Sequence, residues 1–87
     1  QQNVLVNTGA TIDHDCTIGA HTHIAPGCTL SGSVTVEASV HIGTGATIIQ
    51  GCTIGTRSVV GAGAVVIEDV EAGVTVVGVP AHPISQI

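Results

Sequence analysis

The chain has 87 residues and a formal net charge of −5 at pH 7, because six acidic residues face a single cation, Arg57. Nucleic acids and anionic membranes bind clustered Lys and Arg, so this charge balance excludes both as partners. No apolar run approaches the roughly 18 residues of a membrane-spanning segment, and no signal peptide is recognisable, so we expect no membrane span.

An aliphatic residue recurs at every sixth position from Val6 to Val66. This aliphatic column consists of Val6, Ile12, Ile18, Ile24, Leu30, Val36, Ile42, Ile48, Ile54, Val60 and Val66. A second column of small or β-branched residues follows four positions later, at Ala10, Cys16, Thr22, Cys28, Val34, Val40, Ala46, Cys52, Ser58, Ala64 and Val70. A period of six fits neither a helix nor a β-meander and is typical of a solenoid. Three six-residue sides make one coil, so the pattern predicts an all-β fold, a left-handed parallel β-helix of about four coils.

The composition fits a narrow prism filled by small side chains. Phe, Tyr, Trp and Met are absent, and 12 glycines are available for the corners, where the backbone turns. Three cysteines, Cys16, Cys28 and Cys52, fall at equivalent inward positions. We interpret them as buried core residues rather than as a disulfide framework, which favours a reducing, cytoplasmic location.

The repeat domain is expected to cover residues 1–70, with residues 71–87 forming a C-terminal strand or tail that packs on it. The six-residue register breaks in the acidic stretch 67–73, and an extended apolar run follows at 74–77. Pro80 and Pro83 hinder regular ladder pairing, so this tail should lie across the prism. The sequence starts without Met and runs straight into the first coil, which leads us to expect a longer protein that caps this end.

His14 stands between Asp13 and Asp15 in an expected turn. A carboxylate beside an imidazole fixes the tautomer of the ring and stabilises its protonated form, as a general base requires. A solvated turn histidine with acidic neighbours explains the same residues equally well, so both interpretations stay open.

His23 and His41 take the outward position just before an aliphatic residue and are 18 residues apart, so they should stack in one column. For His41, and for His21 at a turn, a structural role is the preferred interpretation. A zinc site like that of the γ-carbonic anhydrases needs two histidines of one chain at a five-residue spacing, and no pair here has it. We expect no metal.

Outward threonines form two columns, at positions 11, 29 and 47 and at positions 17, 35 and 53. Ice-binding β-helices use paired threonine rows on one flat face, whereas each face here would carry a single column. We therefore interpret these threonines as β-branched strand residues.

Several motifs make the chain resemble the hexapeptide-repeat sugar acetyltransferases, and in particular the group of the sialic acid O-acetyltransferase (NeuD) and the nucleotide-amino-sugar N-acetyltransferase (PglD) of bacteria. The resemblance covers essentially the whole chain, and its most specific part is the acid-His-acid box with a second His nine residues later. The motifs are Asn7-Thr8-Gly9-Ala10, Asp13-His14-Asp15-Cys16-Thr17-Ile18-Gly19, His23-Ile24-Ala25-Pro26-Gly27 and Val77-Gly78-Val79-Pro80-Ala81.

This resemblance implies an acetyltransferase that moves the acetyl group of acetyl-CoA directly to a sugar or nucleotide-sugar, by N- or O-acetylation. It implies that His14 is the catalytic base and Asp15 the carboxylate that raises its basicity, where the family often has Glu. It also implies that His23 lies near the thioester, and that the backbones of Thr44 and Ala62 line the groove for the pantetheine arm of CoA.

The chain departs from the family at two points. His82 stands where a basic residue usually follows the Val-Pro-Ala tail, and these 87 residues do not include the N-terminal domain that, by the resemblance, binds the nucleotide-sugar. The alternative is therefore a self-assembling β-helix scaffold, natural or engineered, in which the enzyme-like residues are idle.

The spacing of His14 and His23 bears on the oligomeric state. Each hexad turns the chain about 120° around the prism, so nine residues correspond to about half a turn, and the two side chains point to opposite sides. If both serve one acetyl-CoA, as the resemblance implies, they must come from neighbouring chains. We therefore expect a homotrimer with its sites at the subunit clefts.

Overall fold

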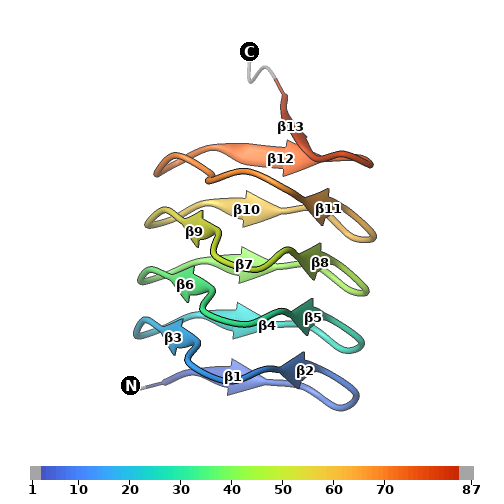
Figure 1. Ribbon diagram of the computed structural model, residues 1–87. Helices are drawn as coiled ribbons and strands as arrows, with labels where there is room; N and C mark the ends of the chain where they lie inside the picture. The colour runs from blue at the N-terminus through green and yellow to red at the C-terminus, as the bar shows by residue number, and fades with distance from the viewer. Residues whose placement is uncertain (1–2, 85–87) are drawn as a thin grey trace.

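The computed structural model describes residues 3–84, which form a solenoid of short strands (Figure 1). Thirteen strands occur in this part of the chain, nearly all of them two residues long. They are β1 Leu5–Val6, β2 Thr11–Ile12, β3 Thr17–Ile18, β4 His23–Ile24, β5 Thr29–Leu30, β6 Thr35–Val36, β7 His41–Ile42, β8 Thr47–Ile48, β9 Thr53–Ile54, β10 Val59–Val60, β11 Val65–Val66, β12 Thr75–Val77 and β13 His82–Pro83. Within these residues, no helix is long and apolar enough to cross a membrane.

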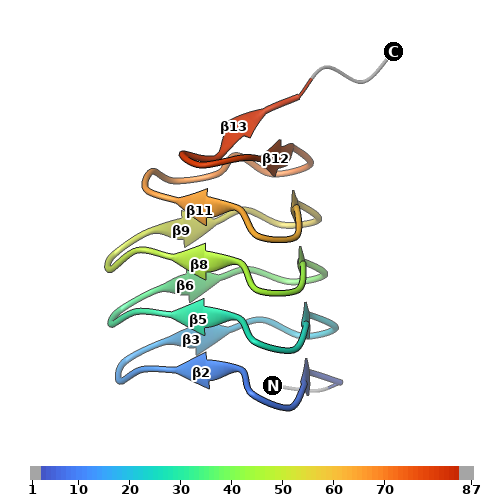
Figure 2. The ribbon, with the colours of Figure 1, turned by 90° about the vertical axis from the view of Figure 1, so that its right-hand side faces the viewer.

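The strands form three sheets, one on each side of a prism. Sheet A has the strand order β1-β4-β7-β10-β12-β13, sheet B the order β2-β5-β8-β11, and sheet C the order β3-β6-β9. Figure 2 shows the strands of sheet B stacked one above another. The register joins equivalent residues of successive coils, so His23 pairs in parallel with His41 and Ile24 with Ile42. The left-handed parallel β-helix predicted from the six-residue period is confirmed.

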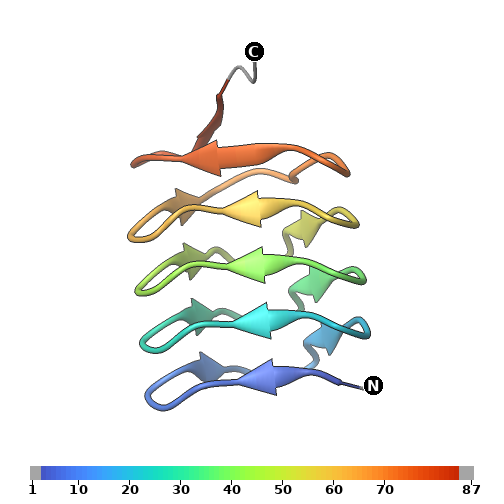
Figure 3. The same cartoon turned by 180° about the vertical axis from the view of Figure 1, so that it is seen from behind.

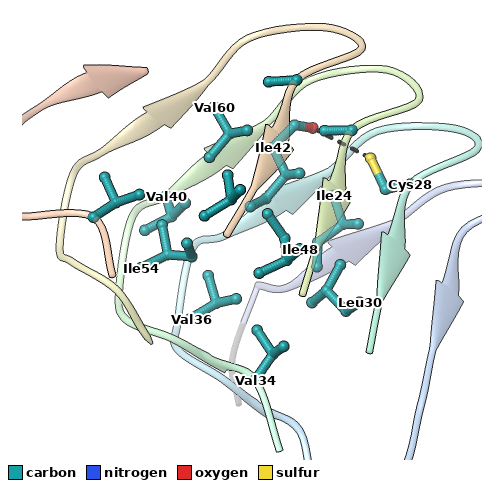
Figure 4. Close-up of a cluster of buried hydrophobic side chains, with 14 of the residues drawn as sticks. Ile24, Cys28, Leu30, Val34, Val36, Val40, Ile42, Ile48, Ile54 and Val60 are labelled. Carbon is teal, nitrogen blue, oxygen red and sulfur yellow. Dashed lines mark hydrogen bonds between the residues drawn. The ribbon is translucent and has the colours of Figure 1, made fainter. Parts of the chain in front are cut away.

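The aliphatic column fills the interior of the prism because side chains alternate between the two faces of each strand. Ile24, Ile42 and Val60 pair in successive strands of sheet A and are completely buried. Figure 4 shows them in the interior together with Leu30, Ile48 and other core residues. Burial of a side chain of this size contributes about 1.5–3 kcal/mol relative to exposure, so contact between coils is the main source of stability.

The first coil is open on one side, because no described residue lies beneath it. Val6 is 44% exposed, whereas Ile24, at the same position one coil later, is 0% exposed. Cys16 is half-buried for the same reason, while Cys28 and Cys52 are buried. The expectation of three buried cysteines is therefore wrong for Cys16.

The corners of the prism depend on a residue in the left-handed region at every sixth position. From residue 3 to residue 63 these residues have φ between 58° and 81°. They are Asn3, Gly9, Asp15, His21, Gly27, Ser33, Ser39, Gly45, Gly51, Arg57 and Gly63. Glycine adopts this conformation most easily, and Asn, Asp and His are the other residue types enriched there. Two candidate residues, Asp15 and His21, are thus corner residues.

The coil becomes two residues shorter near its C-terminal end. Ile54 pairs with Val70 and Val59 with Thr75, each sixteen residues on, instead of the regular spacing of 18. Val70 therefore continues the aliphatic column. Its assignment to the second column of small residues is wrong.

Residues 74–77, expected to lie across the prism, instead continue sheet A, because β12 pairs in parallel with β10. Only β13 turns back, and its Pro83 lies opposite Val76 of β12 in an antiparallel pair. Proline is tolerated here because β13 is the outermost strand of its sheet.

Candidate active site

His14 lies in the turn between β2 and β3, on the edge of the prism where sheet B meets sheet C. The left-handed conformation of Asp15 (φ 62°) folds its carboxylate back, so that Oδ2 lies 3.2 Å from Nδ1 of His14. On the other side, the backbone N–H of His14 donates to Oδ1 of Asp13 at 2.7 Å. Within the acid-His-acid box, Asp15 therefore orients the imidazole, whereas Asp13 holds the backbone of the turn.

This geometry gives the two ring nitrogens of His14 different roles. A carboxylate only accepts hydrogen bonds, so Nδ1 carries the proton and Nε2 keeps its lone pair. The side chain of His14 is 71% exposed, which leaves Nε2 accessible to an incoming substrate. An imidazole held in this way can take up a proton, and the carboxylate of Asp15 then stabilises the positive charge.

His23 lies on the outer face of sheet A and has a partner that was not predicted as a site residue. The side-chain nitrogen Nδ2 of Asn7 lies 2.8 Å from Nε2 of His23 and also donates to the backbone oxygen of Ile24 at 3.2 Å. Because an amide nitrogen only donates, Nε2 of His23 accepts, and its proton is on Nδ1. The signal for Asn7 in the sequence is weak, because the contact joins residues sixteen positions apart in neighbouring coils.

His41 pairs with His23 in the ladder, and the two rings meet edge to face with their centroids 4.7 Å apart. This arrangement confirms the outward stack expected for the pair. His21 is a corner residue with a long contact from Asn3 Nδ2 to its Nδ1, at 3.4 Å. Among residues 3–84, no group of three His, Cys, Asp or Glu side chains is placed to hold a metal ion.

Thr44 and Ala62 occupy the same corner position in successive coils, on the edge where sheet A meets sheet B. The backbone oxygen of Thr44 accepts a hydrogen bond from the N–H of Gly63 at 2.8 Å, which ties the two corners together. Within the described part of the chain, the N–H groups of Thr44 and Ala62 donate to no acceptor. Two exposed backbone donors therefore stand one coil apart.

The five predicted site residues fall into two groups within one chain. Figure 1 looks onto the edge that carries His14 and Asp15, and Figure 3 looks onto sheet A, which carries His23 and borders the edge of Thr44 and Ala62. The structure therefore does not bring the candidate base and His23 together in a single chain. A hollow of about 250 Å³ lies at the C-terminal end, between Val66, Glu71 and Pro83, and none of these five residues lines it.

The hexad corners and the parallel coils define a hexapeptide-repeat β-helix, and the exposed His14–Asp15 pair gives it an accessible imidazole beside a carboxylate. The profile of the family described as bacterial transferase hexapeptide (six repeats) matches residues 1–32 and 33–68. The chain belongs to this family. No curated protein sequence matches it.

Solved structures extend this relationship. The acetyltransferase domain of PglB from Neisseria gonorrhoeae, in complex with acetyl coenzyme A, is 48% identical over 93% of this chain, with a TM-score of 0.92. PerB from Caulobacter crescentus, in complex with CoA and GDP-perosamine, is 44% identical over 94%, with a TM-score of 0.93. The serine acetyltransferase of Neisseria gonorrhoeae is 33% identical over 95%, with a TM-score of 0.90. The chain spans 40% of the first two proteins and 36% of the third.

Proposed function

We propose that this chain is the acetyl-CoA-binding and catalytic part of an acetyltransferase that acts on the amino group of a nucleotide-linked sugar, with His14 as the general base. The observation that carries the proposal is the exposed His14–Asp15 pair, with Nδ1 and Oδ2 3.2 Å apart. An amino-sugar acceptor is favoured over an amino acid because identity is 44% to PerB, solved with GDP-perosamine, and only 33% to the serine acetyltransferase.

In this mechanism the sugar amine attacks the carbonyl carbon of the thioester, and Nε2 of His14 removes a proton from the amine nitrogen. The C–N bond forms, the C–S bond breaks, and the sulfur of CoA leaves and takes up a proton. Asp15 stabilises the imidazolium while it exists. Holding the amine and the thioester together supplies much of the rate enhancement, since it replaces a bimolecular encounter.

His23, Thr44 and Ala62, which lie away from His14 within one chain, bind the acyl donor. The exposed N–H groups of Thr44 and Ala62 are suited to hydrogen bonds with the amide oxygens of the pantetheine arm. The imidazole of His23, with its Nδ1–H, lies near the thioester. Within residues 3–84 these two backbone donors have no protein acceptor, which supports this assignment.

The same proposal places the chain in a longer bacterial protein, because it spans 40% of PglB and PerB. The nucleotide-sugar would bind mainly to an N-terminal domain that precedes this sequence. A cytoplasmic location fits the unpaired thiols of Cys16, Cys28 and Cys52, since disulfides are rare in that compartment.

The first test is His14→Ala in the full-length protein that carries this chain. We expect the turnover number to fall by about 10²–10⁴-fold, the usual size for a lost general base, with acetyl-CoA binding unchanged. Steady-state kinetics with GDP-perosamine or a related amino-sugar nucleotide measure the first quantity. The rise in melting temperature with acetyl-CoA measures the second.

Two variants accompany this test. Asp15→Asn should cost less than His14→Ala, because the imidazole remains and only its orientation and basicity change. His21→Asn is the matched control, since His21 is also an exposed corner histidine and Asn tolerates its left-handed backbone. Wild-type turnover in both His14→Ala and Asp15→Asn would refute the assignment of the base. A wild-type protein that acetyl-CoA does not stabilise would favour the non-catalytic scaffold.

A further inference from the structure

His23 and His41 depart from the residue pattern of the strands that carry them. Just before the aliphatic residue, every other repeat has Thr, Val or Leu on the outer face. These residues are Leu5, Thr11, Thr17, Thr29, Thr35, Thr47, Thr53, Val59 and Val65. Thr and Val are enriched in strands because a branched side chain packs well on the pleated surface, and His is not. The strand itself therefore does not explain why sheet A has two histidines here.

The imidazole of His23 is held at one point by Asn7. The hydrogen bond from Nδ2 of Asn7 reaches Nε2 of His23 at 2.8 Å. A single hydrogen bond fixes the position of one ring atom, but the plane of the ring can still tilt about that atom. His23 therefore needs a second contact before its Nδ1–H points in one direction.

His41 supplies this second contact. It pairs with His23 in the ladder of β4 and β7, on the outer face of the sheet seen in Figure 3, with ring centroids 4.7 Å apart and ring planes at 88°. Edge-to-face rings with centroids about 4.5–7 Å apart are in a favoured geometry. Asn7 belongs to the preceding coil and His41 to the following one, so the imidazole of His23 is held from both sides.

We propose that His41 is a positioning residue, whose ring fixes the tilt of the His23 imidazole so that Nδ1–H points toward the thioester of bound acetyl-CoA. The proposal rests on the proposed function, in which His23 lies near the thioester. It goes beyond that function because it gives a task to His41, which acts through His23 and not on the substrates.

The test is His41→Thr in the full-length protein, which introduces the residue most common at this strand position. We expect the turnover number to fall about 10-fold, because a small misplacement beside the reacting group is costly. The KM for acetyl-CoA should stay unchanged, because Thr44 and Ala62 still hold the pantetheine arm. The melting temperature should stay the same or rise, because Thr favours a strand. A merely structural role for His41 would instead lower the melting temperature together with turnover.

Two variants isolate the contact between the rings. His41→Phe keeps an aromatic ring at this position and should retain turnover within about 2-fold of the wild type. Thr47→Val is the matched control, because it changes the outward position of the next strand in the same coil, on sheet B, and should leave turnover unchanged. A loss in His41→Phe or in Thr47→Val as large as that in His41→Thr would overturn the proposal.

A double variant tests whether His41 acts through His23. In a His23→Ala background, His41→Thr should cause no further loss of turnover, because the ring that it positions is gone. A second loss of about the same size there would show that His41 acts independently. Sedimentation of His41→Thr should match that of the wild type, and a changed assembly would assign the loss to subunit contacts instead.

A crystal structure of His41→Thr separates this proposal from the proposed function. We expect the ring of His23 to be tilted or to occupy two orientations, with its hydrogen bond from Asn7 retained. An unmoved, singly oriented ring would overturn the positioning role. If His23→Ala keeps wild-type turnover and acetyl-CoA binding, the role of His23 in the proposed function fails, and the orientation of the ring alone still decides whether His41 positions it.

Discussion

Asp15 combines two tasks in one residue, because it turns the chain at a corner and holds the imidazole of His14. Its φ of 62° lies in the left-handed region, where Asp is one of the few well-tolerated residues other than Gly. The short side chain then reaches back to the preceding residue at 3.2 Å.

The three cysteines should differ in reactivity because they differ in burial. Burial raises the pKa of the Cys28 and Cys52 thiols above the ordinary value of 9.0, so little thiolate, the reactive form, is present at neutral pH. Cys16 is only half-buried, in the open first coil. We expect iodoacetamide to modify Cys16 first and to modify Cys28 and Cys52 more slowly, by a factor of roughly 10 or more. Mass spectrometry of the peptides follows the three rates.

Unfolding in urea is the control for this experiment, because it should make all three thiols react at similar rates. Labelling of Cys28 as fast as that of Cys16 in the folded protein would contradict the core position of Cys28.

At the scale of the elements, the shortened coil near the C-terminal end leaves one backbone donor without its regular partner. In earlier coils the N–H of Thr17 and of Thr35 donates to a backbone carbonyl of the next coil. At the equivalent Thr53 the acceptor is instead the carboxylate of Asp69, at 2.8 Å. A side chain thus replaces a carbonyl where two residues are missing from the repeat.

Asp69→Ala should therefore lower the free energy of unfolding by about 1 kcal/mol, the usual net contribution of one hydrogen bond. Asp69→Asn should lower it less, because its amide oxygen can still accept from Thr53. Urea unfolding curves measure both values. Glu68→Ala is the matched control, because this neighbouring acid makes no hydrogen bond within residues 3–84, and an equal loss there would argue against the role of Asp69.

At the scale of the whole molecule, exposed apolar side chains mark the two surfaces that carry the candidate site residues. Leu5 and Val59 are 54% and 37% exposed in the outward column of sheet A, which also holds His23. Ile49 and Ile67 are 40% and 51% exposed on the edge above His14. In the homotrimer that we propose, contact between these two surfaces of neighbouring copies would bury both and bring His14 close to His23.

Mixing two inactive variants tests this shared site. In a trimer assembled from equal amounts of His14→Ala and His23→Ala chains, about a quarter of the clefts would contain both intact histidines by chance. Turnover of the mixture, after co-expression, should then clearly exceed the mean of the two separate variants. Sedimentation should also report a trimer for the wild type. A mixture no more active than that mean, or a stable monomer, would rule out the shared site and leave the fold intact.

The fold could be predicted from the sequence because the pattern that specifies it is local and is repeated in every coil. An aliphatic residue at every sixth position decides which side chain turns inward, and this held from Val6 to Val66. The His14–Asp15 pair was also predictable, since neighbouring residues in one turn can meet only in a few ways.

Contacts between coils depended on the tertiary structure. The pairing of Asn7 with His23 joins residues sixteen positions apart, which the stacking of coils brings together. The six-residue register placed Val70 in the second column, and only its pairing with Ile54 showed that it continues the aliphatic column. Cys16 had the same repeat position as Cys28, yet its burial differed because burial depends on the coil stacked against it. A periodic sequence determines which way each side chain points, whereas the neighbouring coil determines what that side chain touches.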